Sequence, residues 1–231
     1  SGHGSYLLLN IGDDTASGRG LMGTTRVNRT QQGSALILSG LRGDRTAETL
    51  IEQMLRDRTG HPELLTMACE ASGLMGSPSM LRPLLDVALD DSLPQYVRSS
   101  AISALGRIGD PSVTPALVEL LDGSHDARRA AAVALGYTAH SGEDLVIRRL
   151  ARLLETESDA PTRHFAAVSL GRIGGPTARL ALMQAFEDPA TDMRPWVVLG
   201  LAILERNDPQ GGLVDELITR IHSESNANTL S

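Results

Sequence analysis

The chain repeats one short block of residues, and this repeat constrains the fold more than any other feature. Nearly identical copies are AISALGRIG from Ala101, AAVALGY from Ala131 and AAVSLGRIG from Ala166, with looser copies from residues 35, 68 and 196. The first glycines of these blocks stand 29 to 35 residues apart: Gly40, Gly73, Gly106, Gly136, Gly171 and Gly200. A period of this length, carried by a helical pattern, is typical of a solenoid of helix pairs.

Each unit of the repeat reads as two helices, of which the block forms the second. The clearest first helix is residues 111–122, where apolar residues recur at helical spacing and proline is confined to the first turn. Comparable runs are residues 46–56, 79–89, 143–154, 177–186 and 213–221. The sequence therefore predicts an all-α fold, a right-handed superhelix of about six helix pairs with no sheet.

The composition fits this interpretation and narrows the function. Aromatic residues make up only 3% of the 231 residues, so the core must consist of aliphatic side chains in thin helix-on-helix layers. The formal net charge of -7 argues against a general nucleic-acid binder. The single Cys69 excludes an internal disulfide, and no segment is long and apolar enough to span a membrane. The compartment is left open.

The pattern D-x-x-x-R-x-x-A-A-x-A-L-G-x-I-G-D resembles HEAT repeats, and among them the short HEAT-like class found in phycobilisome lyases and many bacterial scaffold proteins. Residues 31–222 carry the resemblance, which is best over residues 95–175. It implies the fold and says little about function. It also implies a structural ladder in which Arg98, Arg128 and Arg163 pair with turn carboxylates, and the candidate carboxylates are Asp90, Asp122 and Asp188.

The ends of the chain depart from the pattern. Residues 7–13 resemble the tail of one more repeat, whereas residues 14–33 are rich in glycine and threonine, which form helices poorly. We therefore expect an irregular N-terminal segment over residues 1–33, interpreted as the remnant of a preceding repeat, a solenoid over residues 34–222 and a tail over residues 223–231. The chain would then be a fragment of a larger protein.

Second helices line the concave face in HEAT folds, so the block positions suggest which residues are exposed there. One predicted column is Leu36, Cys69, Ile102, Ala132, Ala167 and Trp196. A second is Leu41, Leu74, Arg107, Tyr137, Arg172 and Leu201, and a third is Leu65, Arg98, Arg128, Arg163 and Asp192. From these columns we predict a partner-binding surface made of Ile102, Arg98, Arg107, Arg128, Tyr137, Arg163, Arg172 and Trp196.

Within this surface Arg107 and Arg172 are the favoured contacts. They follow the repeated glycine at a position where other units carry leucine or tyrosine, so the fold does not require arginine there. An acidic peptide, a carboxylate or a phosphate would complement them. The alternative is that both are solvated residues favoured by the helix dipole, and Trp196 could equally fill the last layer between repeats.

Motifs for catalysis and metal binding are missing from the sequence. Deoxyhypusine hydroxylases also carry HEAT-like repeats, but they bind iron through His-Glu dipeptides, and no histidine here precedes a glutamate. Nucleotide-binding and nucleophile-elbow motifs do not occur either. We therefore expect no catalytic residues, no metal and no cofactor.

Two classes of function remain after these exclusions, with a third less favoured. The favoured class is a non-enzymatic scaffold or adaptor whose concave face binds a protein or peptide, and an acidic partner would complement its arginines. The alternative is a phycobilin lyase-like subunit that holds a bilin and its acceptor protein, since arginines beside aromatic residues suit the propionates of a tetrapyrrole. Nucleic-acid binding through the arginine stripe is the third.

Overall fold

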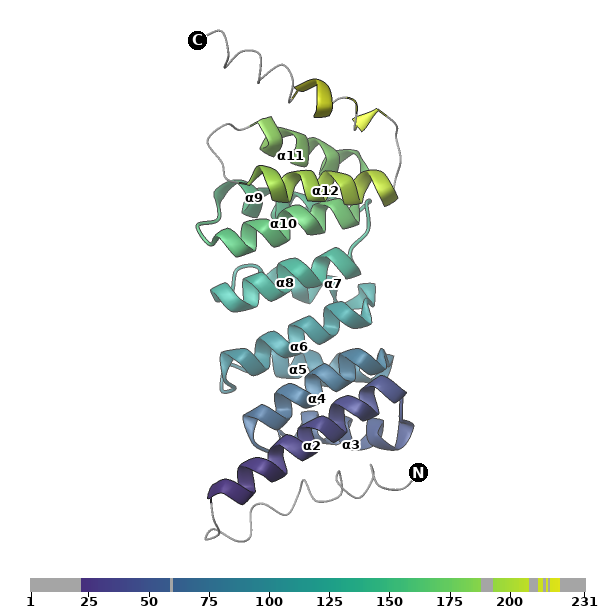
Figure 1. The fold of residues 1–231 in the computed structure, drawn as a ribbon, viewed down its shortest axis with the longest axis vertical. Helices are drawn as coiled ribbons and strands as arrows, with labels where there is room; N and C mark the ends of the chain where they lie inside the picture. The colour runs from purple at the N-terminus through teal and green to yellow at the C-terminus, as the bar shows by residue number, and fades with distance from the viewer. Residues whose placement is uncertain are drawn as a thin grey trace. The chain divides into compact units, whose positions relative to one another are not determined.

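The described residues are helical with short connections, as Figure 1 shows. The computed structural model describes residues 22–58, 60–187 and 193–207 and, beyond them, residues 212, 213, 215 and 217–220. No strand occurs in these ranges, which confirms the predicted all-α fold class. None of the helices in the described part of the chain is long and apolar enough to cross a membrane.

The chain divides into two compact units, residues 1–139 and residues 140–231. The helices of the first unit are α2 (Met22–Arg42), α3 (Arg45–Asp57), α4 (Pro62–Met75), α5 (Leu81–Ala88), α6 (Gln95–Ile108), α7 (Thr114–Leu120) and α8 (His125–Thr138). Short 3-10 turns, η2 (Pro78–Met80) and η3 (Pro111–Val113), lead into α5 and α7. The second unit contains α9 (Asp144–Thr156), α10 (Ala160–Ile173), α11 (Gly175–Glu187) and α12 (Arg194–Asn207).

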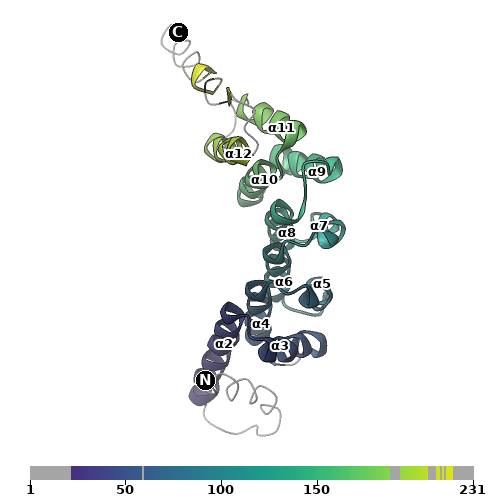
Figure 2. The ribbon, with the colours of Figure 1, turned by 90° about the vertical axis from the view of Figure 1, so that its right-hand side faces the viewer.

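The first unit has two layers, which Figure 2 shows edge on. The second helices of the pairs form one layer, in which α2 packs on α4, α4 on α6 and α6 on α8. The first helices α3, α5 and α7 lie behind them and pack on their own partners. In the second unit, α10 packs on α12, and α9 and α11 pack on each other.

The junctions between successive helix pairs contain the glycines that end the repeated blocks. Gly76 and Gly109 end α4 and α6 in the left-handed conformation, with φ of 66° and 75°, which glycine adopts without steric cost. After Gly109 the next helical turn is capped by a carboxylate: Asp110 accepts a hydrogen bond from the backbone N–H of Ser112 at 2.8 Å. Each turn therefore closes one helix and starts another.

The structure differs from the irregular segment expected at the N-terminus. Helix α2 begins at Met22, so residues 22–33 are helical despite their glycine and threonine content. The reason is packing, because Gly33 and Gly40 lie where α2 approaches α4. A Cβ at Gly40 would stand 2.7 Å from the carbonyl oxygen of Ala71. The predicted remnant repeat at residues 7–13 and the tail at residues 223–231 lie outside the described residues. The division of the chain into these segments stays a prediction.

Candidate functional site

The first predicted column of exposed residues is wrong for five of its six members. Leu36, Cys69, Ile102, Ala132 and Ala167 have no exposed surface. Each lies four residues before the block glycine, on the side of the second helix that packs against its neighbours. Burial also raises the pKa of the Cys69 thiol to about 12, so the thiol stays protonated and is a poor nucleophile.

Helix α12 is the second helix of its pair. Its residues are shifted by two positions relative to the alignment that matches the block glycines of all pairs. Gly40, Gly73 and Gly106 each face the residue two positions before the next block glycine: a Cβ at Gly106 would stand 2.6 Å from the Cα of Ala134. At Gly171 the facing residue is Gly200, whose carbonyl oxygen would be 2.1 Å from such a Cβ. Gly200 therefore takes the place of Ala134, and Ala202 takes the place of the block glycine.

This shift changes which residues of α12 are equivalent to those of the other second helices. Arg194, and not Asp192, occupies the position of Arg163, while Trp196 stands where Phe165 does. Asp192 itself lies outside the described residues. Sequence reasoning missed Arg194 because the repeated glycine was the signal used for alignment, and in α12 that glycine marks a different position.

The arginines at the starts of the second helices hold the preceding turn together. The Nε of Arg128 donates to the carbonyl of Leu121 at 2.8 Å, and its Nη2 donates to the carbonyl of Gly123 at 3.1 Å. Arg98 likewise donates to the carbonyl of Ala88 at 3.2 Å. These carbonyls belong to the end of the first helix, where backbone acceptors lack helical partners. Arg98 and Arg128 therefore stabilise the turn.

The carboxylate partners of the arginines differ in part from the predicted ladder. Arg98 pairs with Asp91 at 2.7 Å instead of Asp90. Asp90 pairs at 3.2 Å with Arg58, which follows α3 in the preceding helix pair. The hydroxyl and backbone N–H of Ser92, with Arg58, lower the pKa of Asp90. Asp188 lies outside the described residues.

Removing the guanidinium of Arg128 is expected to destabilise the first unit. The variant Arg128→Met keeps the apolar stem and leaves two carbonyls without their donors, so the free energy of unfolding should fall by about 1 to 3 kcal/mol. Urea denaturation followed by circular dichroism measures the loss. The control Arg148→Met replaces an exposed arginine of α9 and should change stability by less than about 0.5 kcal/mol. Equal stability of the two variants would contradict the structural role.

Most of the residues after the block glycines are exposed on the second helices, whereas Leu74 is half-buried. Arg107, Tyr137 and Arg172 all point outward, and Tyr137 keeps 51% of its surface exposed. Leu201 is fully buried, because the shift of α12 places it in the inter-helix contact. In α6, α8 and α10 the exposed stripe thus runs through the residue after the glycine and through positions three to four residues apart before it.

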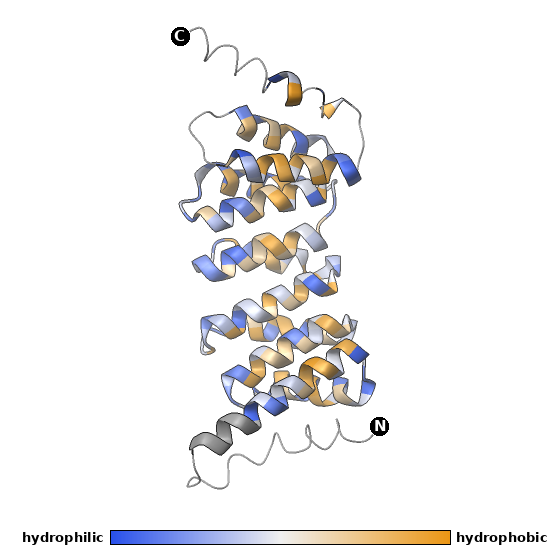
Figure 3. Cartoon of the chain, in the orientation of Figure 1, coloured by the Kyte–Doolittle hydropathy of each residue, from blue (hydrophilic) through white to orange (hydrophobic). Residues whose placement is uncertain are grey.

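In the second unit this stripe carries a pair of stacked rings. His164 of α10 and Trp196 of α12 have ring centroids 4.4 Å apart and planes inclined by 14°. Trp196 is 38% exposed, and beside it Leu199 is 43% exposed. We call His164, Trp196, Leu199 and Arg172 the aromatic face. Figure 3 shows that the residues in the middle of α12 are largely hydrophobic.

Basic residues border the aromatic face. Arg172 lies eight residues after His164 on α10, which is about 12 Å along the helix. Arg194 lies over the ring of Phe186, with its guanidinium carbon 5.6 Å from the ring centroid. Arg163 and Arg194 are both half-buried at the starts of their helices. No group of three or more potential metal ligands occurs among the described residues.

The sequence and fold are similar to known proteins. The protein family described as HEAT repeats matches residues 47–136 and 91–164, and the family described as PBS lyase HEAT-like repeat matches residues 162–188. The bilin biosynthesis protein PecF of Nostoc sp. (strain PCC 7120 / SAG 25.82 / UTEX 2576) is 32% identical over 153 residues, covering 60% of this chain and 87% of PecF. Human deoxyhypusine hydroxylase in complex with glycerol is 21% identical, with 88% of this chain and 84% of that chain covered and a TM-score of 0.45.

The likeness to PecF corrects the functional expectation. The favoured prediction was a non-enzymatic scaffold or adaptor, and it is wrong, because the curated relative is a protein of bilin biosynthesis. The expectation that the chain is not an enzyme is wrong for the same reason. The sequence misled us here because the repeat motif indicates the fold and carries no mark of the ligand.

Proposed function

Because the chain belongs to the HEAT-repeat family, and because its relative PecF is a bilin biosynthesis protein, we propose that it is a lyase-type protein that holds a bilin for transfer to an acceptor protein. The observation that carries the proposal is the likeness to PecF, which extends over 87% of that protein. The aromatic face of the second unit is the proposed binding site.

The chemistry of a bilin matches this face in two respects. A linear tetrapyrrole is a conjugated, largely apolar molecule, and the stacked rings of His164 and Trp196 offer it a flat aromatic surface. Its propionates need cations, and the exposed Arg172 lies about 12 Å along α10 from His164. Arg172 can therefore hold a propionate while the rings of His164 and Trp196 contact the pyrroles.

The proposal assigns binding and orientation to the chain. Stacking on Trp196 fixes the plane of the tetrapyrrole, and the Arg172 guanidinium fixes its direction along the helix. A bilin held in this way keeps one face open to the acceptor protein. The acceptor is the protein partner that a HEAT-repeat surface is suited to bind.

Titration with phycocyanobilin tests the proposal. We expect the wild-type chain to change the visible absorbance of the bilin and to bind it saturably. The variant Trp196→Leu should weaken binding at least about tenfold, because it removes the exposed stacking surface. Arg172→Gln should weaken binding by several-fold, since a charge-assisted hydrogen bond is lost.

Two variants serve as matched controls for this titration. Tyr96→Leu removes another exposed aromatic side chain, on α6 of the first unit, and Arg152→Gln removes an exposed arginine of α9. Both should bind bilin as the wild type does. An unchanged bilin spectrum with the wild type would refute the function, whereas binding that survives both Trp196→Leu and Arg172→Gln would refute the site alone.

A further inference from the structure

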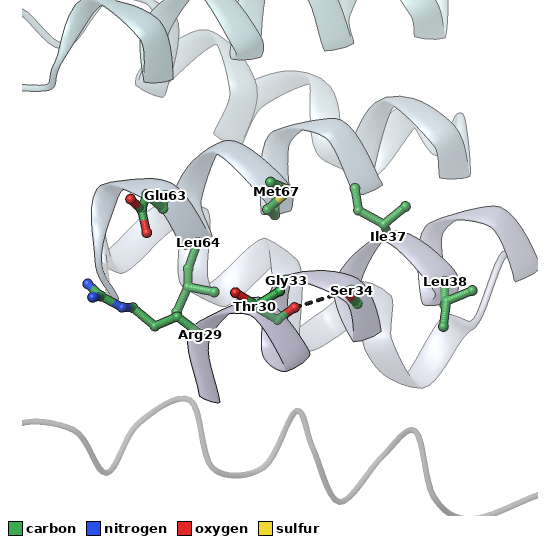
Figure 4. A pocket seen from close by; sticks show the side chains of 9 residues that line it. All are labelled: Arg29, Thr30, Gly33, Ser34, Ile37, Leu38, Glu63, Leu64 and Met67. Atoms are coloured by element: carbon green, nitrogen blue, oxygen red, sulfur yellow. Dashed lines mark hydrogen bonds between the residues drawn. The ribbon is translucent and has the colours of Figure 1, made fainter. Parts of the chain in front are cut away.

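A pocket of about 700 Å³ lies between α2 and the start of α4, in the first unit and therefore apart from the aromatic face (Figure 4). Its α2 wall includes Arg29, Thr30 and Ser34, and its α4 wall includes Glu63 and Met67. Pockets of about 300 to 1,000 Å³ are the size that encloses a small organic ligand.

The pocket has a polar end and an apolar end. In Figure 4 the side chains of Arg29 and Glu63 lie at one end, and those of Ile37 and Leu38 lie at the other. Met67 lies between the two ends, opposite the turn of α2 that contains Gly33. Leu38 is 53% exposed and Met67 is 36% exposed, so apolar surface remains open to a ligand.

Small residues of α2 leave the space that the pocket occupies. A Cβ at Gly33 would stand 3.1 Å from the Cγ of Met67, so a larger residue there would fill the gap between the helices. The hydroxyl of Ser34 donates to the carbonyl of Thr30 at 2.9 Å, within α2 itself. The Ser34 hydroxyl therefore already has a hydrogen-bond partner within α2.

Arg29 is the residue at the polar end that can take a hydrogen-bond acceptor from a ligand. Its Nε is buried and has no hydrogen-bond partner among the described residues. A guanidinium stays charged at all physiological pH values, and a buried donor without a partner is costly. Glu63 extends into solvent, with 63% of its side chain exposed, and lies 3.8 Å from the Nδ1 of His61. Both charged residues line the pocket, and Arg29 is the one that brings a buried donor without a partner, so we assign the ligand's charged group to Arg29.

We infer that this pocket binds an amphipathic monocarboxylate, a molecule with one carboxylate and an unbranched or flat apolar body. The carboxylate pairs with the guanidinium of Arg29, and the apolar body extends past Met67 toward Ile37 and Leu38. This site is separate from the proposed bilin site, because it lies in the other unit and provides one arginine. The two proposals can therefore fail independently.

Isothermal titration calorimetry with dodecanoate, below its micelle concentration, tests the inference. The wild type should bind dodecanoate at a single saturable site. Arg29→Gln should weaken dodecanoate binding at least about tenfold and leave the weaker binding of dodecanol unchanged, because only the acid uses the charge. Ser34→Trp should abolish both, since Ser34 is exposed on the pocket wall and a tryptophan there fills the space.

The control variant is Arg42→Gln, which removes an exposed arginine at the end of the same helix, outside the pocket. It should bind dodecanoate like the wild type. No binding by the wild type would overturn the inference, as would equal affinities in wild type and Arg29→Gln. Binding that persists in Ser34→Trp would place the fatty acid elsewhere and would also overturn it. Circular dichroism of each variant verifies that it is folded.

Discussion

Replacing Leu135 with alanine is expected to lower the free energy of unfolding by about 2 to 5 kcal/mol. Leu135 occupies the block position before the glycine, and it is fully buried, as are the equivalent Leu105 and Leu170. Truncation removes the apolar contacts and leaves a cavity that the close-packed helices fill only in part. Urea denaturation followed at 222 nm measures the loss.

The matched control for this prediction is Leu145→Ala, at a leucine of α9 that is 60% exposed. Its effect should stay within about 0.5 kcal/mol, because little of that side chain is withdrawn from water. In a linear array a lesion also uncouples the helices on either side, so the transition of Leu135→Ala should become broader as well as earlier. A wild-type transition for Leu135→Ala would mean that its helix face is assigned wrongly.

Replacing Gly171 with alanine is expected to destabilise the second unit by about 3 kcal/mol or more. Helix propensity alone predicts the opposite sign, since alanine in a helix interior is favoured over glycine by about 1 kcal/mol. The added Cβ, however, would stand 2.1 Å from the carbonyl oxygen of Gly200 and 2.8 Å from its Cα. Backbone atoms of a packed helix cannot yield as a flexible side chain does, so α10 and α12 must move apart.

The control Gly142→Ala lies in the same unit, at a glycine with nothing within 4 Å of the added Cβ. Its stability should match the wild type within about 0.5 kcal/mol. Thermal and urea unfolding of both variants show whether each substitution lowers or raises the free energy of unfolding relative to the wild type. A gain in stability for Gly171→Ala would show that propensity outweighs packing, and that the close approach of the two helices is not strict.

The sequence by itself determined the architecture. Its period and the glycines that end its blocks predicted the order of helices and the junctions at Gly76 and Gly109, because each helix must bury an apolar face and each turn needs a residue that tolerates positive φ. It also predicted that Arg107 and Arg172 are exposed. These features depend on local chemistry that recurs in every unit.

Only the tertiary structure decided which face of the second helices is exposed. A second helix contacts the preceding helix, the following helix and its own partner, so small and apolar residues surround most of it and the periodicity does not mark one buried side. Ile102 was assigned to the surface for this reason and is buried. The two-residue shift of α12 arises from the contact of Gly171 with Gly200. It stacks Trp196 on His164 and places Arg194 at the position equivalent to Arg163. A contact between residues so far apart in the chain is a property of packing, and the linear pattern does not contain it.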